Sequence, residues 1–141
     1  MLPLGLLFNI SMSYHAYTTS GMVLKGIPTG EADKYFYILT EQLGLIVATA
    51  RSVRKGESKL ARGLEDFCLG TFTFIKGKHS WKVTGVDPKE NMYRSIPYKE
   101  SKIALVNILL LIRRLVRGES LHRELFSIAK SLFIVLSTQR Y

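Results

Sequence analysis

The pattern of hydrophobic positions changes near residue 91. Before it, apolar and β-branched residues form short, partly alternating runs separated by turn residues, which is typical of β-strands. After residue 95 they recur at the spacing of helices. The first pattern predicts five strands, at 14–27, 34–40, 45–53, 67–76 and 79–86.

The second strand is apolar on both faces, which predicts a central position. In the third strand, Leu45 and Val47 share one face and Ile46 and Ala48 the other. The pair Asp87-Pro88 is expected to end the fifth strand because proline cannot donate to a strand ladder.

A short helix over 59–64, capped by Ser58, is predicted between the third and fourth strands. This order is that of an OB-fold barrel. An SH3-like barrel is the alternative, and the interposed helix argues against it. The fold class predicted is therefore α+β, a five-stranded OB-fold β-barrel followed by two C-terminal helices.

Two helices are predicted after Ser95, at 103–116 and 121–137. The first is apolar nearly all round, which predicts burial. The second is expected to bury one stripe, which Phe126, Phe133 and Leu136 widen. The stripe consists of Leu121, Leu125, Ile128, Leu132 and Val135.

The chain divides into an N-terminal extension at 1–13, an OB domain at 14–90 and a helical pair at 95–137. The extension fits three interpretations: an extra packing segment, a disordered tag-like extension, or a start codon assigned too early. We favour Met12 as the true start. Neither the extension nor the ten-residue apolar run 103–112 is long enough to span a bilayer, so no membrane partner is expected.

The 141 residues carry 20 Lys and Arg against 11 Asp and Glu, a net charge of +9. This balance favours a polyanionic partner. The single cysteine, Cys68, excludes an internal disulfide and a cysteine zinc site, and agrees with a reducing cytosol. The three histidines are scattered, so we predict neither a metal nor a cofactor.

Basic residues cluster between strand three and the short helix, and we expect them to contact DNA phosphates, making binding salt-dependent. The alternative is a solvated loop that only aids solubility. The cluster consists of Arg51, Arg54, Lys55, Lys59 and Arg62.

Further DNA contacts are expected from Lys34 and from Lys76, Lys78 and Lys82 around the turn between strands four and five. Tyr35 and Tyr37 share a face of strand two and are candidates for base stacking. The alternative is that Phe36 and Ile38 form the outward face. Trp81 is assigned to the barrel core or to helix packing.

No catalytic constellation is present in the sequence. Ser58, His79 and Asp87 have no arrangement that would orient a nucleophile and a base. No phosphate-binding glycine pattern follows a strand and opens a helix. We therefore predict a protein that is not an enzyme.

Three stretches resemble the RecO family of bacterial recombination mediator and DNA-annealing proteins. They are GMVLKGIPTGEAD at 21–33, ILTEQLGLIVATARSVRKGESKLARGLEDF at 38–67 and RLVRGESLHRELFSIAKSLF at 114–133. The resemblance covers roughly residues 15 to 137. It implies an OB domain followed by helices of a larger helical domain.

The resemblance also implies binding of single-stranded DNA, with duplex DNA as a second ligand, for strand annealing and recombinase loading in the bacterial cytosol or nucleoid. RecR and the single-strand binding protein are the implied partners. Family members are longer and often carry a zinc module, so we expect a truncated, split or reduced member. The alternative function is a protein-interaction module that binds an acidic partner tail or a missing domain.

Overall fold

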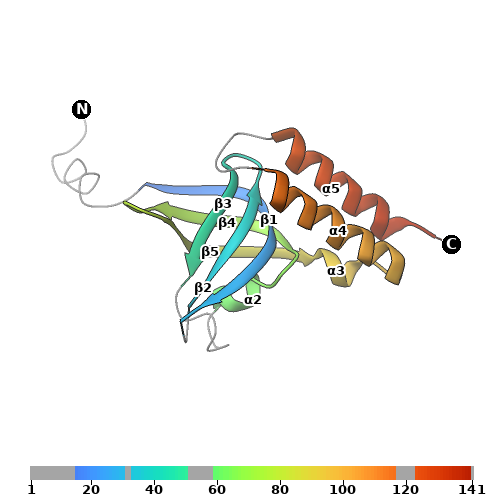
Figure 1. Cartoon of the computed structure of the whole chain (residues 1–141), viewed down its shortest axis with the longest axis horizontal. Helices are drawn as coiled ribbons and strands as arrows, with labels where there is room; N and C mark the ends of the chain where they lie inside the picture. The colour runs from blue at the N-terminus through green and yellow to red at the C-terminus, as the bar shows by residue number, and fades with distance from the viewer. Residues whose placement is uncertain (1–14, 31–32, 51–58, 117–122, 141) are drawn as a thin grey trace.

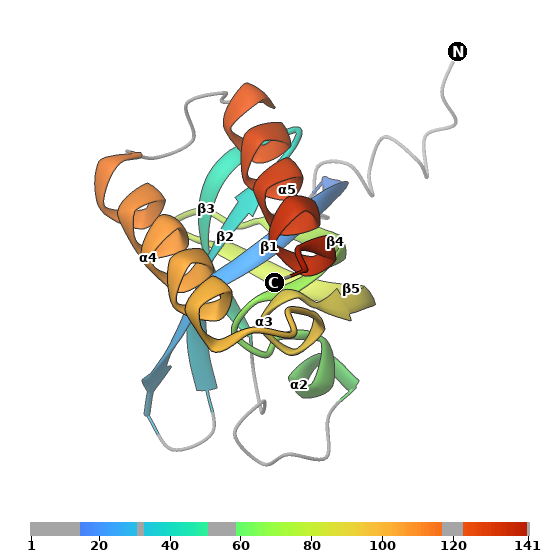
Figure 2. The ribbon, with the colours of Figure 1, turned by 90° about the vertical axis from the view of Figure 1, so that its right-hand side faces the viewer.

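The computed structural model describes residues 15–30, 33–50, 59–116 and 123–140. Five strands form a closed barrel in the order β1-β2-β3-β5-β4, with α2 between β3 and β4. Three further helices follow the barrel, and α4 and α5 lie side by side along it (Figures 1 and 2). The elements are β1 (Ala16–Thr29), β2 (Asp33–Thr40), β3 (Gly44–Ala50), α2 (Lys59–Gly63), β4 (Cys68–Lys76), β5 (Trp81–Asn91), α3 (Met92–Ser95), α4 (Lys99–Leu115) and α5 (Arg123–Thr138).

The predicted fold class is confirmed: the structure is an α+β arrangement with an OB-like five-stranded barrel and a C-terminal helical pair. The short helix α3 was not predicted. The five expected strands are present, with differences of up to five residues at the described ends, and the expected strand residues 14 and 51–53 lie outside the described residues. The expected extension at 1–13 lies outside the described residues.

The barrel encloses one core, and the helices cover a second. Phe36, Ile38, Phe72 and Phe74 are at most 1 % exposed and belong to the interior cluster. Because successive side chains of a strand point to opposite faces, the residues between them point outward. Some outward residues form the second cluster with α3, α4 and α5. The strand residues of this cluster are Met22, Leu24, Leu39, Leu45 and Leu69.

Strand β2 lies between β1 and β3, as its two apolar faces predicted. Its inner face packs in the barrel, and part of its outer face packs under the helices. Tyr37 belongs to the outer set, among the residues packed against the helical cluster. The alternation predicted for strand three is also correct, because Ile46 and Ala48 are interior and Val47 is 45 % exposed.

The prediction that Asp87-Pro88 ends the fifth strand is wrong, because β5 continues to Asn91. Among the described residues, β5 pairs with β3 only at Trp81 and Lys82, and with β4 along its length. The missing N–H of Pro88 therefore costs no ladder bond toward β3. Opposite it, Gly70 leaves the necessary room, since a Cβ there would lie 2.5 Å from the Asp87 carbonyl oxygen.

The prediction that the first C-terminal helix is buried all round is also wrong. Helix α4 buries Leu105, Leu109 and Ile112 but leaves Leu111 55 % and Leu115 68 % exposed. One side packs on the barrel and α5, and the other faces solvent.

Helix α5 buries two of the residues expected to widen the stripe, Phe126 and Phe133, whereas much of the expected stripe itself is exposed. Phe126, Ala129 and Phe133 are buried, whereas Ile128 is 55 % and Val135 59 % exposed. Both stripes are apolar at helical spacing, so spacing could not choose between them. Small Ala129 between two phenylalanines suits close packing better. Leu121 of the expected stripe lies outside the described residues.

Candidate nucleic-acid interface

The predicted basic cluster is only partly within the described residues. Arg51, Arg54 and Lys55 lie in segment 51–58, outside them. This segment connects Ala50, the last residue of β3, to Lys59, the first of α2. Arg62, in the last turn of α2, is exposed. The surface near Ala50 and Lys59 is therefore the described part of the protein to which the cluster is connected.

The turn between β4 and β5 holds two of the predicted lysines in defined positions. Gly77 donates its backbone N–H to the Ser80 carbonyl oxygen at 2.8 Å, which closes the turn. The turn pairs Lys76 with Trp81, and the Lys76 Nζ lies 5.3 Å from the centroid of the indole ring. Lys78, within the turn, is exposed.

Lys82 contributes to two hollows in the surface next to this turn. The first, of about 250 Å³, lies between β3, α2 and β5 and is lined by Thr49, Leu60, Lys82, Val83 and Thr84. The second, of about 200 Å³, is lined by Ile75, Gly77, Lys78, His79, Ser80 and Lys82. Thr49 also donates its hydroxyl to the Trp81 carbonyl oxygen at 3.4 Å.

We call the surface around these two hollows, with Thr49, Leu60, Lys78 and Lys82, the Lys82 face. No acidic residue lines either hollow among the described residues. A face with lysines and hydroxyls but no carboxylates can contact phosphate oxygens through charge and hydrogen bonds. Its lining residues come from β3, α2, β4, β5 and the β4–β5 turn, and Figure 1 shows α2 and this turn away from the pair α4 and α5.

Lys34 belongs to a different part of the surface. Its Nζ lies 5.4 Å from the ring centroid of Phe36. It lines a wider hollow of about 420 Å³ together with Glu65, Asp66 and Arg94. Because this hollow carries both signs of charge, its field favours phosphate less than that of the Lys82 face.

The predicted stacking pair lies on the outer face of β2. Phe36 and Ile38 point into the barrel, so the alternative that they form the outward face is wrong. The rings of Tyr35 and Tyr37 meet edge to face with centroids 6.0 Å apart. The guanidinium carbon of Arg113 lies 4.4 Å from the centroid of Tyr37. Base stacking on this pair stays a prediction, and Tyr37 already has a partner.

Trp81 is 7 % exposed and belongs to the barrel interior, so of its two predicted places, barrel core or helix packing, the core is correct. Its indole Nε1 is buried, and none of the described residues provides it with a hydrogen-bond partner. Cys68 is also interior, and burial raises the pKa of its thiol to about 11, with a smaller contribution from the nearby charge of Glu65.

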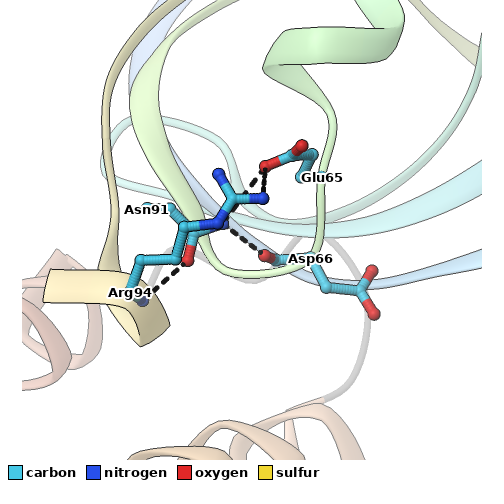
Figure 3. A network of polar contacts seen from close by, with 4 residues as sticks. All are labelled: Glu65, Asp66, Asn91 and Arg94. Carbon is cyan, nitrogen blue, oxygen red and sulfur yellow. Dashed lines mark hydrogen bonds and ion pairs between the residues drawn. The ribbon is translucent and has the colours of Figure 1, made fainter. Parts of the chain in front are cut away.

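A polar network joins the barrel to the helices, and sequence reasoning missed it (Figure 3). Asn91 donates from Nδ2 to the Asp66 carbonyl oxygen at 3.1 Å and to Glu65 Oε2 at 3.4 Å. Its Oδ1 accepts the backbone N–H of Arg94 at 3.1 Å and so caps α3. Arg94 also pairs with Glu65 at 2.9 Å. The available sequence signal was asparagine before a helical turn, which is a preferred N-cap.

The described residues give no sign of a metal site or a membrane span. Within 15–30, 33–50, 59–116 and 123–140, no group of three or more His, Cys, Asp or Glu side chains could hold a metal ion. None of the helices in these ranges combines the length and apolar character needed to cross a membrane.

Comparison with known proteins identifies one family. The model of the family described as "Recombination protein O N terminal" matches residues 12–92. A protein named DNA repair protein RecO from Acetivibrio thermocellus is 30% identical over 128 residues, 86% of this chain and 49% of that protein. Proteins of the same name from a Synechococcus strain and from Dehalococcoides mccartyi are 44% identical over 69 residues and 41% identical over 71.

The chain spans between a quarter and a half of the length of these relatives. The two shorter alignments cover 49% and 50% of this chain but 24% and 28% of the relatives.

Proposed function

Because the chain belongs to the recombination protein O family, we propose that it is a non-catalytic DNA-binding protein of repair and homologous recombination. It binds single-stranded DNA, and duplex DNA as a second ligand, through the Lys82 face and the adjoining basic segment 51–58. Strand annealing and recombinase loading would follow from holding DNA strands close together while screening their phosphates.

One observation supports this proposal: among the described residues, no acidic residue lines either of the two hollows that share Lys82, and the first hollow includes Thr49 at the end of β3, from which the chain continues into the basic cluster. Lys82 lines both the hollow at the β4–β5 turn and the hollow beside α2. A DNA backbone that ran from the first to the second would therefore meet Lys78 and then Lys82. Affinity should then fall linearly with the logarithm of salt concentration, because each neutralised phosphate releases counterions.

The test is fluorescence anisotropy of labelled oligo-dT with the full chain at several salt concentrations. The triple variant Arg51→Glu/Arg54→Glu/Lys55→Glu should bind more weakly and with a flatter salt slope. The matched control is Arg114→Glu/Lys130→Glu/Arg140→Glu, three exposed cations on α4 and α5 or just after α5. Equal losses of oligo-dT affinity in both triple variants would mean that only net charge matters. If the unaltered chain did not bind oligo-dT at low salt, the proposal would be contradicted.

A second candidate function is a protein-interaction module, which the exposed apolar side chains of α4 and α5 favour. Leu111, Leu115, Ile128 and Val135 are each more than half exposed. On each helix the two residues are spaced so that they share a face, and an exposed apolar face is typical of interaction sites. RecR and the acidic tail of the single-strand binding protein remain the partners expected from the family. Light scattering across a concentration range, with and without each purified partner, would show whether this surface forms complexes.

By the same family role we expect the protein to act in the bacterial cytosol or nucleoid. The division into a DNA-binding part at 14–90 and a helical pair at 95–137 is likewise proposed. Limited proteolysis followed by intact-mass measurement would test it, because a cut confined to residues near 91–95 would separate the two parts.

A further inference from the structure

The start of β1 brings an exposed aromatic side chain to the end of the barrel that carries the β4–β5 turn. Figure 1 shows this end of β1 beside the ends of β4 and β5, and Tyr17 pairs with Phe74 across the β1–β4 ladder. Residues paired directly across a ladder share a face of the sheet. Tyr17 therefore lies on the same face as the interior residue Phe74, at the open end of the barrel.

The ring of Tyr17 continues an aromatic row from the interior to the surface. Phe74 and Trp81 meet at nearly right angles with centroids 6.1 Å apart, and Trp81 and Tyr17 do the same at 5.4 Å. His15 follows at 6.2 Å from Tyr17. Trp81 is 7 % exposed, whereas Tyr17 is 38 % exposed. The buried members hold the exposed ring in position, so less side-chain entropy is lost when a ligand stacks on it.

Cationic side chains lie beside this row. The Lys76 Nζ lies 5.3 Å from the centroid of Trp81, the ring that Tyr17 contacts. Lys78 and Lys82 line the hollow at the β4–β5 turn, which leads into Trp81 at the start of β5. An exposed aromatic ring flanked by lysines is the arrangement that proteins use to bind single strands without sequence preference.

The other exposed aromatic ring of this size is less suited to the same task. Among the described Phe, Tyr and Trp side chains, only Tyr17 and Tyr93 are exposed, at 38 % and 39 %, and the others are buried or half-buried. The ring of Tyr93 stacks on Phe67 and has the Lys102 Nζ 4.5 Å from its centroid. Tyr93 also lines the hollow that contains Glu65 and Asp66, whose charges repel phosphate.

We propose that Tyr17 is the base-stacking residue of the DNA-binding surface, with His15 beside it and Lys76 and Lys78 contacting the flanking phosphates. This inference rests on the proposed DNA binding and assigns the base contact to β1 rather than to Tyr35 and Tyr37 of β2. It extends the Lys82 face to the open end of the barrel.

Paired oligonucleotides separate base stacking from phosphate contact. The probes are labelled oligo-dT and an abasic deoxyribose-phosphate chain of equal length, each titrated by anisotropy at one low salt concentration. The unaltered chain should bind oligo-dT more tightly. Tyr17→Ala should lose about five- to 150-fold in affinity for oligo-dT and bind the abasic chain as before. Tyr17→Phe keeps the ring and should bind both probes as the unaltered chain does.

Tyr93→Ala is the matched control, since it removes the other exposed tyrosine, and it should leave affinity for both probes unchanged. Near-ultraviolet circular dichroism checks that each variant keeps the aromatic packing. If Tyr17→Ala fails to fold, Tyr17→Leu replaces it, because leucine fills the space against Trp81 without a flat ring, and the same selective loss is expected.

Three results would overturn the assignment: unchanged oligo-dT affinity in the folded Tyr17 variant, an equal loss with both probes, or no preference of the unaltered chain for bases over the abasic chain. These outcomes differ from failure of the proposed function, in which the unaltered chain would bind neither probe at low salt.

Discussion

Arg113 of α4 lies over the ring of Tyr37 of β2, with 4.4 Å between the guanidinium carbon and the ring centroid. At the same end of the helical pair, Arg123 of α5 donates from a terminal guanidinium nitrogen to Gln42 Oε1 at 3.1 Å. Arg113 lies in the last turn of α4, where a cation complements the helix dipole. Its contact with Tyr37 also joins the helix to the barrel.

A double-mutant cycle on Arg113→Ala and Tyr37→Ala should give a coupling free energy of about 1–2 kcal/mol. Either single variant already removes the half-buried cation–π contact, so the double variant does not lose it a second time. Urea unfolding followed by circular dichroism measures the four stabilities. Arg114→Ala, which removes the exposed neighbour, should change stability by less than about 0.5 kcal/mol. A coupling of zero would mean that the ring and the guanidinium are adjacent without attraction.

Asn91 should matter more for stability than the ion pair beside it. Its side chain makes three hydrogen bonds that fix the end of β5, the 65–66 turn and the start of α3. Asn91→Ala should cost about 1–2 kcal/mol, as loss of a helix cap typically does. Arg94→Ala breaks a pair between side chains that are 70% and 42% exposed and should cost at most about 1 kcal/mol.

Thermal unfolding of the two variants, with Ser95→Ala as a control for an exposed hydrogen bond to Glu90, orders these contributions. Asn91→Asp adds a further distinction. It keeps the capping oxygen but removes the donor and places a second carboxylate beside Glu65, so its melting temperature should lie below that of the unaltered chain. A larger loss in Arg94→Ala than in Asn91→Ala would contradict the assignment.

The sequence predicted the barrel well because strand alternation and turn residues are local signals. It also gave Trp81 two places, the barrel core or helix packing, and the core is correct. It failed at Pro88, since whether a proline ends a strand depends on which neighbour needs its N–H, and that is a tertiary fact. It failed on the stripe of α5, because Phe126 and Ile128 are equally apolar and only the shape of the barrel selects between them.

The candidate site shows the same division. Charge spacing along the chain indicated Lys76, Lys78 and Lys82 as a group, and the hollows around Lys82 bring Lys78 and Lys82 together. The same spacing gave no reason to separate Lys34 from them or to notice Tyr17. Both facts depend on contacts between distant strands: Tyr17 meets Trp81 across 64 positions of sequence. For Arg51, Arg54 and Lys55, the DNA contact stays a prediction.

The buried thiol of Cys68 should make stability fall at alkaline pH. Burial raises the thiol pKa in the folded protein from 9.0 to about 11. Between these values the unfolded chain has released the proton and the folded chain has not, so unfolding is favoured as pH rises. This contribution is fully present below pH 9 and is lost progressively between 9 and 11.

Urea unfolding of the unaltered chain and of Cys68→Ala at several pH values isolates the effect from titration of lysines and tyrosines. The difference in unfolding free energy between the two proteins should shrink across this window. Parallel stability profiles would mean that the folded thiol titrates near its ordinary pKa. A thiol reagent at pH 8 should also label Cys68 slowly in the native protein and fast in urea, because the thiolate is the reactive form and burial suppresses it.

The two lysines of the turn hollow should each contribute about one phosphate contact. Lys78→Gln/Lys82→Gln should reduce the magnitude of the slope of log affinity against log salt by about 1.4, since each contact with a single strand contributes about 0.7. The expected loss of affinity is similar for oligo-dT and for an abasic chain, because both contacts are made to the backbone. This pattern is the opposite of the one expected for Tyr17→Ala.

Lys89→Gln/Lys130→Gln removes the same charge from exposed positions that line a hollow with Glu90, where no phosphate path is proposed. It should leave the slope within about 0.5 of the original, because distant exposed charges are screened at ordinary ionic strength. If both pairs change the slope equally, DNA binds a diffuse cationic surface and no phosphate contact belongs to the Lys82 face. A slope that changes only in the Lys78/Lys82 variant assigns that backbone contact to the two hollows.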